Sequence, residues 1–106
     1  MKETPEFEFC AQRLKALAEP ERLRIVQTLF QGELNVSDLA EALADDLVKV
    51  SHHLGVLRNA GLVTARKDGR FVVYALHPDV YAGSKVVGDK RRLELGCCRL
   101  EIPLDS

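Results

Sequence analysis

The stretch that decides the fold is Asp46-Leu-Val-Lys-Val-Ser-His-His-Leu-Gly-Val-Leu-Arg-Asn-Ala-Gly-Leu-Val63. Its bulky apolar residues recur at the i, i+4, i+7 spacing of one helix face, while polar and cationic residues fall largely on the other faces. The apolar face comprises Val50, Leu54 and Leu57. Asp46 predicts the helix start because its side chain can accept backbone N–H bonds, and Gly61 predicts the helix end because glycine adopts left-handed conformations.

The segment that follows, residues 62–76, predicts a β-hairpin. Two short runs, 62–67 and 70–76, are rich in β-branched and aromatic residues, and Asp68-Gly69 between them suits a tight turn with positive φ. Three cations lie at or near its tip, namely Arg66, Lys67 and Arg70. Such a tip is typical of contacts with the phosphates of a duplex.

A shorter helix is predicted just upstream. Asn35 can serve as its N-cap, with Asp38 three positions later as in a capping box. One apolar face then follows, made of Val36, Leu39, Ala40 and Leu43. Two helices joined by a tight turn form a helix-turn-helix, and the hairpin supplies a wing. We therefore predict a mainly α fold with a β-hairpin wing (α+β), a winged helix-turn-helix.

Four motifs, in this order and spacing, resemble the ArsR/SmtB family of dimeric winged-helix repressors. They are AEPERLRIV (residues 18–26), ELNVSDLA (33–40), VSHHLGVLRNAGLV (50–63) and GRFVVYAL (69–76), so the resemblance covers roughly residues 8–77. It implies a repressor that binds double-stranded operator DNA as a homodimer and is released by an inducer, often a metal or metalloid ion. It also implies that the first helix packs at the dimer interface, where Phe7, Phe9 and Leu14 are candidates; the alternative is that they only cap the core of the monomer.

The start of the recognition helix departs from the family pattern. Family members usually carry small polar residues where Leu47 and Val48 stand. Apolar side chains can touch a thymine methyl group but cannot make the bidentate hydrogen bonds that read adenine or guanine. The candidate DNA-contacting residues are Leu47, Val48, Lys49, Ser51, His52, His53, Arg58, Arg66, Lys67 and Arg70. His52 or His53 could instead be a partly packed helix histidine.

The resemblance implies an inducer site, yet two sites known in the family are absent. Asn35 and Ser37 replace a pair of cysteines, and no histidine follows residue 77. The remaining soft ligands are Cys10, Cys97 and Cys98. Three thiolates suit a thiophilic ion such as arsenite, cadmium, lead or mercury. Two alternatives stay open, namely a thiol redox sensor and cysteines that are inert or structural; an odd cysteine count points away from a disulfide framework.

Length and charge place these features within one small protein. The 106 residues suggest residues 1–80 as the winged-helix and dimerisation domain, and residues 81–106 as a tail whose alternating pattern from Leu93 onward is typical of a strand. The net charge of −1 hides an asymmetry, because five Lys and Arg stand against ten Asp and Glu in residues 1–46, and ten against six in residues 47–106. The basic half contains the recognition helix and the wing.

Other classes of function are disfavoured. The chain has no phosphate-binding glycine loop and no nucleophile motif, so an enzyme is not expected. It has no apolar run long enough for a membrane span and no signal peptide, so a cytoplasmic protein is expected. The alternative to a DNA-binding repressor is a winged-helix protein-interaction module that no longer reads DNA. The acidic pair Asp45-Asp46 and the weak net charge favour that alternative.

Overall fold

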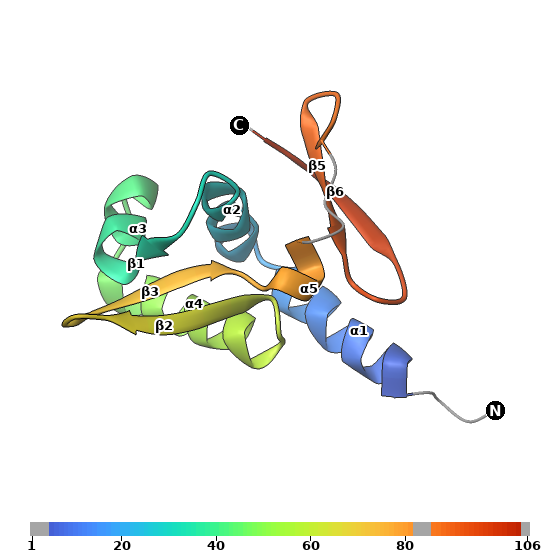
Figure 1. Ribbon diagram of the computed structural model, residues 1–106, viewed down its shortest axis with the longest axis horizontal. Helices are drawn as coiled ribbons and strands as arrows, with labels where there is room; N and C mark the ends of the chain where they lie inside the picture. The colour runs from blue at the N-terminus through green and yellow to red at the C-terminus, as the bar shows by residue number, and fades with distance from the viewer. Residues whose placement is uncertain (1–4, 82–85, 105–106) are drawn as a thin grey trace.

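The helices are spread along the length of the molecule and two antiparallel sheets lie beside them in the computed structural model, which describes residues 5–81 and 86–104 (Figure 1). The helices are α1 (Pro5–Leu17), α2 (Pro20–Leu29), α3 (Val36–Leu43), α4 (Leu47–Asn59) and α5 (Pro78–Tyr81). The strands are β1 (Leu34–Asn35), β2 (Val63–Asp68), β3 (Phe71–Leu76), β4 (Val86–Val87), β5 (Lys90–Glu94) and β6 (Arg99–Pro103). None of the described helices is long and apolar enough to cross a membrane.

The helix-turn-helix is set by side chains close to each helix end. Asn35 Oδ1 accepts a hydrogen bond from the Asp38 backbone N–H at 2.8 Å, and Asp46 Oδ1 accepts one from Val48 at 2.7 Å, which confirms both predicted N-caps. Between the helices, Ala44 takes a left-handed conformation with φ 51°, uncommon for a residue with a Cβ. Asp45 Oδ1 accepts the Asp46 N–H at 2.7 Å, so both residues of the acidic pair have a local structural role in this turn.

The wing forms as predicted, with its turn one residue later than expected. β2 and β3 pair antiparallel from Val63↔Leu76 to Asp68↔Phe71, so the turn residues are Gly69 and Arg70 rather than Asp68 and Gly69. Gly69 has φ 64° and no residue beside it has a positive φ. A turn with glycine at its first central position needs only that one positive φ, which leaves Asp68 in the ladder. β1 adds to β3, giving the order β1-β3-β2.

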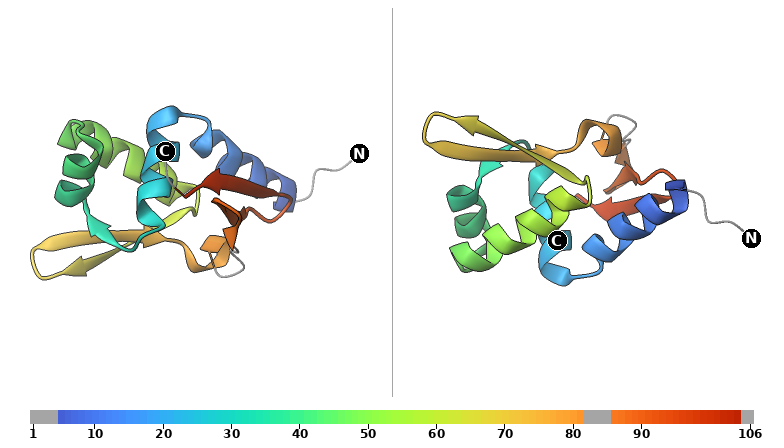
Figure 2. Two further views of the ribbon diagram at one scale, coloured as in Figure 1. Left: turned by 90° about the horizontal axis from the view of Figure 1, so that it is seen from above. Right: turned by 90° about the horizontal axis from the view of Figure 1, so that it is seen from below.

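The tail folds into a second sheet that shares the core of the winged helix. Its order is β4-β5-β6, and β5 pairs antiparallel with β6 from Lys90↔Pro103 to Glu94↔Arg99. Three of its residues are buried in the same apolar cluster as the helices, namely Leu93, Leu95 and Ile102. The wing projects toward one end of the molecule, and α1 with β5 and β6 lies toward the other (Figures 1 and 2).

Helix α2 supplies the centre of that core. Ile25, Val26 and Leu29 are buried on its inner face. Leu23 on the same helix is 38% exposed and lines a hollow together with Leu100 and Ile102 of β6.

Candidate nucleic-acid interface and cysteine cluster

The recognition helix α4 is packed against other helices on one face and is exposed to solvent on the opposite face. Val50, Leu54 and Leu57 are buried, which fixes the helix on α2 and α3. Around its first turn the side chains are exposed, with Val48 76% and Leu47 48% accessible. Lys49, Ser51 and His52 are exposed as well. The N-terminal part of a recognition helix is the part that meets base edges, so this surface has the position required for reading a groove.

The wing lies at the same end of the molecule as the start of α4, as the three views agree (Figures 1 and 2). Its cations are not equivalent. Arg66 forms an ion pair with Glu33 beside β1, whereas neither Lys67 nor Arg70 has an ion-pair partner among residues 5–81 and 86–104. The Arg70 guanidinium lies over the Phe71 ring, 5.5 Å from its centroid. Lys67 and Arg70 are therefore the cations most available to phosphate, and Arg66 is partly neutralised.

The two histidines of α4 differ in their surroundings. His52 is exposed, whereas His53 is half-buried and its Nδ1 lies 3.2 Å from an Nη1 of Arg22 on α2. That contact favours the packed alternative for His53. Arg58 is exposed near the other end of α4, roughly 16 Å along the axis from Leu47 at 1.5 Å per residue. Such a position suits contact with a phosphate better than contact with a base.

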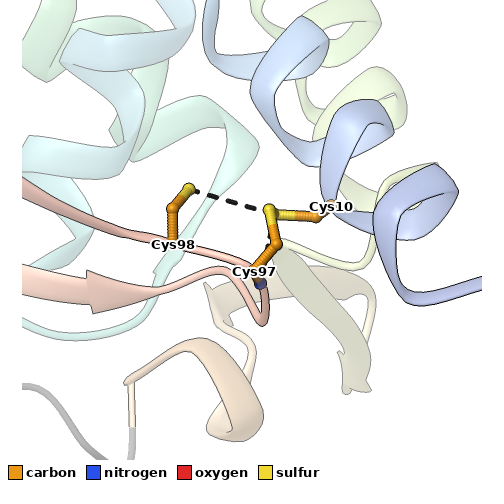
Figure 3. A group of neighbouring side chains, drawn as sticks. All are labelled: Cys10, Cys97 and Cys98. Atoms are coloured by element: carbon orange, nitrogen blue, oxygen red, sulfur yellow. Dashed lines mark hydrogen bonds between the residues drawn. A yellow bond between two sulfur atoms is a disulfide. The ribbon is translucent and has the colours of Figure 1, made fainter. Parts of the chain in front are cut away.

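The three cysteines, far apart in sequence, come together where α1 meets the turn between β5 and β6 (Figure 3). Cys10 and Cys97 form a disulfide with a Cα–Cα distance of 5.9 Å, and Cys98 Sγ lies 3.9 Å from Cys10 Sγ. All three sulfurs lie within 4.8 Å of one another. Cys10 is buried, Cys98 is half-buried and Cys97 is exposed, so solvent reaches the cluster on the side of Cys97.

The disulfide corrects the expectation of free thiols. Adjacent residues on a strand point to opposite faces, but the residues after β5 leave the ladder, and Gly96 has φ 100°. Leu93 and Leu95 are buried in the common core, and the Arg13 side chain on α1 donates to the Leu95 carbonyl oxygen, so the turn lies against α1 where Cys97 meets Cys10. Within the described residues Cys98 is the free cysteine. When reduced, the cluster offers three sulfur donors, a set that fits a soft ion and not a hard one.

Arg13 is a residue of this region that sequence reasoning missed. It is 8% exposed, and its Nη1 donates to the Leu95 carbonyl oxygen at 3.0 Å. Its guanidinium lies over the Phe9 ring, 4.6 Å from the centroid. The one sequence signal was its place three residues after Cys10, on the same face of an amphipathic helix.

The fold and the exposed helix beside a basic wing define a winged helix-turn-helix protein. Residues 19–65 match the family model described as bacterial regulatory protein, arsR family. The chain is 42% identical over 85 residues to the arsenical resistance operon repressor of Escherichia coli, covering 78% of this chain and 73% of that one. It is 51% identical over 67 residues to the transcriptional regulator NmtR of Mycobacterium tuberculosis, covering 63% of this chain. The chain spans 56% of NmtR's length.

Solved structures agree with these relatives. HlyU from Vibrio cholerae superimposes with a TM-score of 0.66 at 35% identity, covering 71% of this chain and 82% of that one. A homodimeric winged helix-turn-helix DNA-binding domain from Mycobacterium bovis gives a TM-score of 0.65 at 33% identity, covering 72% and 73%. The chain belongs to the arsR family, which is a family of transcriptional regulators and not of enzymes.

Proposed function

We propose that this protein is a repressor that binds operator DNA as a homodimer, with α4 in the major groove and the wing on the adjacent backbone. The observation that carries this proposal is the exposed first turn of α4 at the same end of the molecule as the wing, whose cations Lys67 and Arg70 have no ion-pair partner among the described residues. Base edges are read by helix residues in the groove, while cations on the backbone set affinity and register. We assign base contact to Leu47, Val48, Lys49, Ser51 and His52, and phosphate contact to Lys67, Arg70, Arg58 and, in part, Arg66; His53 supports α4 from below.

A homodimer follows from the geometry of operator binding. Two recognition helices related by a two-fold axis reach half-sites about one helical turn apart, roughly 34 Å. Helix α1 supports this arrangement, since its side chains Phe9 and Leu14 are exposed, as is Phe7. The Mycobacterium bovis neighbour is described as homodimeric. Light scattering at micromolar concentration should give twice the chain mass, and a monomer would contradict the proposed mode of binding.

The inducer acts, in this proposal, on the cluster of Cys10, Cys97 and Cys98. The reduced cluster brings three thiolates within reach of one ion, and the Escherichia coli relative is named for arsenical resistance. Arsenite, Cd(II), Pb(II) and Hg(II) are the thiophilic candidates. Binding requires deprotonated thiols, so it releases protons and weakens at low pH.

A second candidate is a thiol redox signal at the same cluster. The disulfide between Cys10 and Cys97 favours it. Forming that bond from two thiols releases two protons and two electrons to an oxidant such as a peroxide, and a cellular dithiol reverses the step. Because the disulfide occupies two of the three donors, the oxidised protein should not bind the ion. The two signals are therefore separable by redox state.

Binding to duplex DNA at several salt concentrations tests the central part of the proposal. Phosphate contacts release counterions, so the logarithm of the affinity should fall linearly with the logarithm of the salt concentration. Reduced protein and a random-sequence duplex suffice for this step. In-vitro selection then supplies the operator. A protein-interaction module would bind neither duplex, and that result would overturn the proposal.

A further inference from the structure

Arg13 is a buried charge that neither the DNA-facing surface nor the cysteine chemistry accounts for. It is the one charged side chain classed as buried among the residues described, and no carboxylate there pairs with it. Burying a guanidinium costs free energy unless hydrogen bonds compensate. Its Nε has no hydrogen-bond partner in the described structure. The position of Arg13 therefore depends on the few contacts that it does make.

On one side Arg13 holds the turn that carries two of the cysteines. Its Nη1 donates to the Leu95 carbonyl oxygen at 3.0 Å. Cys10, three residues earlier on the same face of α1, is bonded to Cys97 of that turn. The Cys97 backbone N–H also points to Cys10 Sγ, at 3.3 Å. Two positions about one helical turn apart on α1 thus hold the same turn, one through sulfur and one through a hydrogen bond.

On the other side Arg13 reaches the point where the recognition helix gives way to the wing. Gly61 lies between α4 and β2 with φ 76°. A Cβ placed there would lie 3.4 Å from Phe9 Cζ and 3.7 Å from Arg13 Nη2. The stacked pair of Phe9 and Arg13 therefore packs directly on this junction. A shift of that pair would change the angle between α4 and the wing.

We propose that Arg13 is a positioning residue that transmits the state of the cysteine cluster to the junction at Gly61. This inference rests on the proposed inducer site. Cys10 is fixed on a helix, whereas Cys97 and Cys98 lie on a turn, so a change in how the sulfurs are held is taken up by the turn. A disulfide holds two sulfurs about 2 Å apart, and an ion holds thiolates farther apart through metal–sulfur bonds of roughly 2.3 Å or more, whereas free thiols in the reduced protein carry neither restraint. Movement of the turn displaces the Leu95 carbonyl, and the guanidinium follows it.

The test compares Arg13→Met with the parent, using the reduced full-length protein. Arg13→Met keeps an unbranched, apolar stem of similar length and removes the donor. Arg24→Met is the matched control, because Arg24 also donates to a backbone carbonyl, that of Leu43, but touches neither the turn nor the junction. Fluorescence anisotropy measures affinity for a duplex selected on the parent protein, with and without Cd(II). Thiolate-to-metal absorbance measures Cd(II) binding separately.

In the parent and in Arg24→Met, Cd(II) should lower DNA affinity by roughly 5- to 150-fold, the usual range of allosteric coupling. Arg13→Met should bind Cd(II) within about threefold of the parent, yet change its DNA affinity less than about twofold on loading. Arg13→Lys keeps a donor for the Leu95 carbonyl and loses the planar contact with Phe9, so its response should be intermediate. The decisive quantity is the ratio of DNA affinity without Cd(II) to DNA affinity with Cd(II). If Arg13 had a structural role alone, its replacement would alter stability or Cd(II) affinity and leave this ratio unchanged.

Full parental release in Arg13→Met with intact Cd(II) binding would overturn the inference. If Arg13→Met fails to unfold cooperatively, Arg13→Lys decides, since an unchanged ratio there contradicts the proposal and a reduced ratio supports it. Failure of the proposed function looks different. A parent that binds no duplex contradicts the repressor itself, and a parent that binds DNA but ignores Cd(II) overturns the ion as inducer and this inference with it.

Discussion

Two ends of the molecule differ in how far apart in the sequence their contacting residues are. The DNA-facing end comprises α3, the start of α4 and the wing, and the cysteine end comprises α1 and the turn between β5 and β6. At the DNA-facing end, Asn35 caps a residue three positions away, Asp46 caps residues two and three positions away, and Gly69 turns a two-residue loop. At the cysteine end, Arg13 and Leu95 are 82 residues apart and the Cys10–Cys97 bond spans 87. The geometry of a local contact is fixed by residues that are neighbours in the sequence. The geometry of a long-range contact depends on how two distant segments pack and bond to each other.

That difference suits the two ends to different tasks. A surface that reads DNA should keep one shape, and caps with a tight turn hold it without reference to the rest of the chain. A surface that senses a signal needs two arrangements of comparable free energy. In our proposal the sulfur cluster exists as thiols, as a disulfide or as an ion site, and each of these states would set the turn beside α1 differently. This comparison is therefore tested by substituting residues at one end and measuring the effect on stability or on DNA affinity.

The largest effects should come from the shared core, which joins the two ends. Leu54 of α4 and Leu93 of β5 are both fully buried in one apolar cluster. Truncating a buried leucine costs about 2–5 kcal/mol, so Leu54→Ala and Leu93→Ala should each lower the free energy of unfolding by that amount. Urea unfolding followed by circular dichroism should show one transition in both variants. Val86→Ala, at an exposed position in the same sheet, is the control and should change stability by less than about 0.5 kcal/mol.

A different outcome would separate the two ends. If Leu93→Ala leaves the main transition in place and a second, weaker transition appears, the second sheet folds as its own unit. Residues 81–106 would then be a tail in energetic terms, and the coupling through α1 would lose its basis.

Substitutions in the wing should give the next largest effects. The loss of DNA affinity should be larger for cations without an ion-pair partner than for the paired Arg66. Lys67→Ala and Arg70→Ala should each weaken DNA binding by about 5- to 10-fold near 0.1 M salt and lower the salt slope by about one. Arg66→Ala should cost less, because Glu33 already pairs with Arg66. For the same reason Glu33→Gln should strengthen binding. Anisotropy titrations at four salt concentrations measure both quantities, and equal losses for all three cations would refute the grading.

The smallest effect concerns the apolar start of α4. Val48 is largely exposed and can meet a thymine methyl group. Replacing one thymine by uracil in the selected operator removes only that methyl group and should weaken binding about threefold, in line with the burial of one methyl group. Val48→Ala should show the same loss on the thymine duplex and no further loss with uracil. Additive losses in the variant would mean that Val48 does not touch this methyl group.

Much of the DNA-facing end was predictable because its determinants are local. The caps at Asn35 and Asp46 and the apolar face of α4 follow from spacing, and all are present. The wing turn was misplaced by one residue, because the sequence does not show which of two neighbouring positions takes the positive φ. The partner of His53 was also hidden, since Arg22 comes from another helix.

The cysteine end was predictable only as a set of residue types. Three soft ligands were evident, and the alternating pattern after Leu93 is typical of the strands found there. The disulfide was not foreseen, because the approach of Cys97 to Cys10 depends on how a sheet packs on α1. Arg13 gave little sign of its burial, since arginines on helices are usually solvated.

The most direct test of the account is the effect of Cd(II) on operator affinity in the reduced protein and in Cys97→Ser/Cys98→Ser. The account predicts that Cd(II) weakens DNA binding by the parent roughly 5- to 150-fold. The double variant should bind the operator within about twofold of the apo parent and show no response, since its serine hydroxyls lie far from the DNA-facing surface and do not bind a soft ion. Operator release by Cd(II) that persists in this variant, and in one lacking Cys10 as well, would contradict a signal entering through the cysteines.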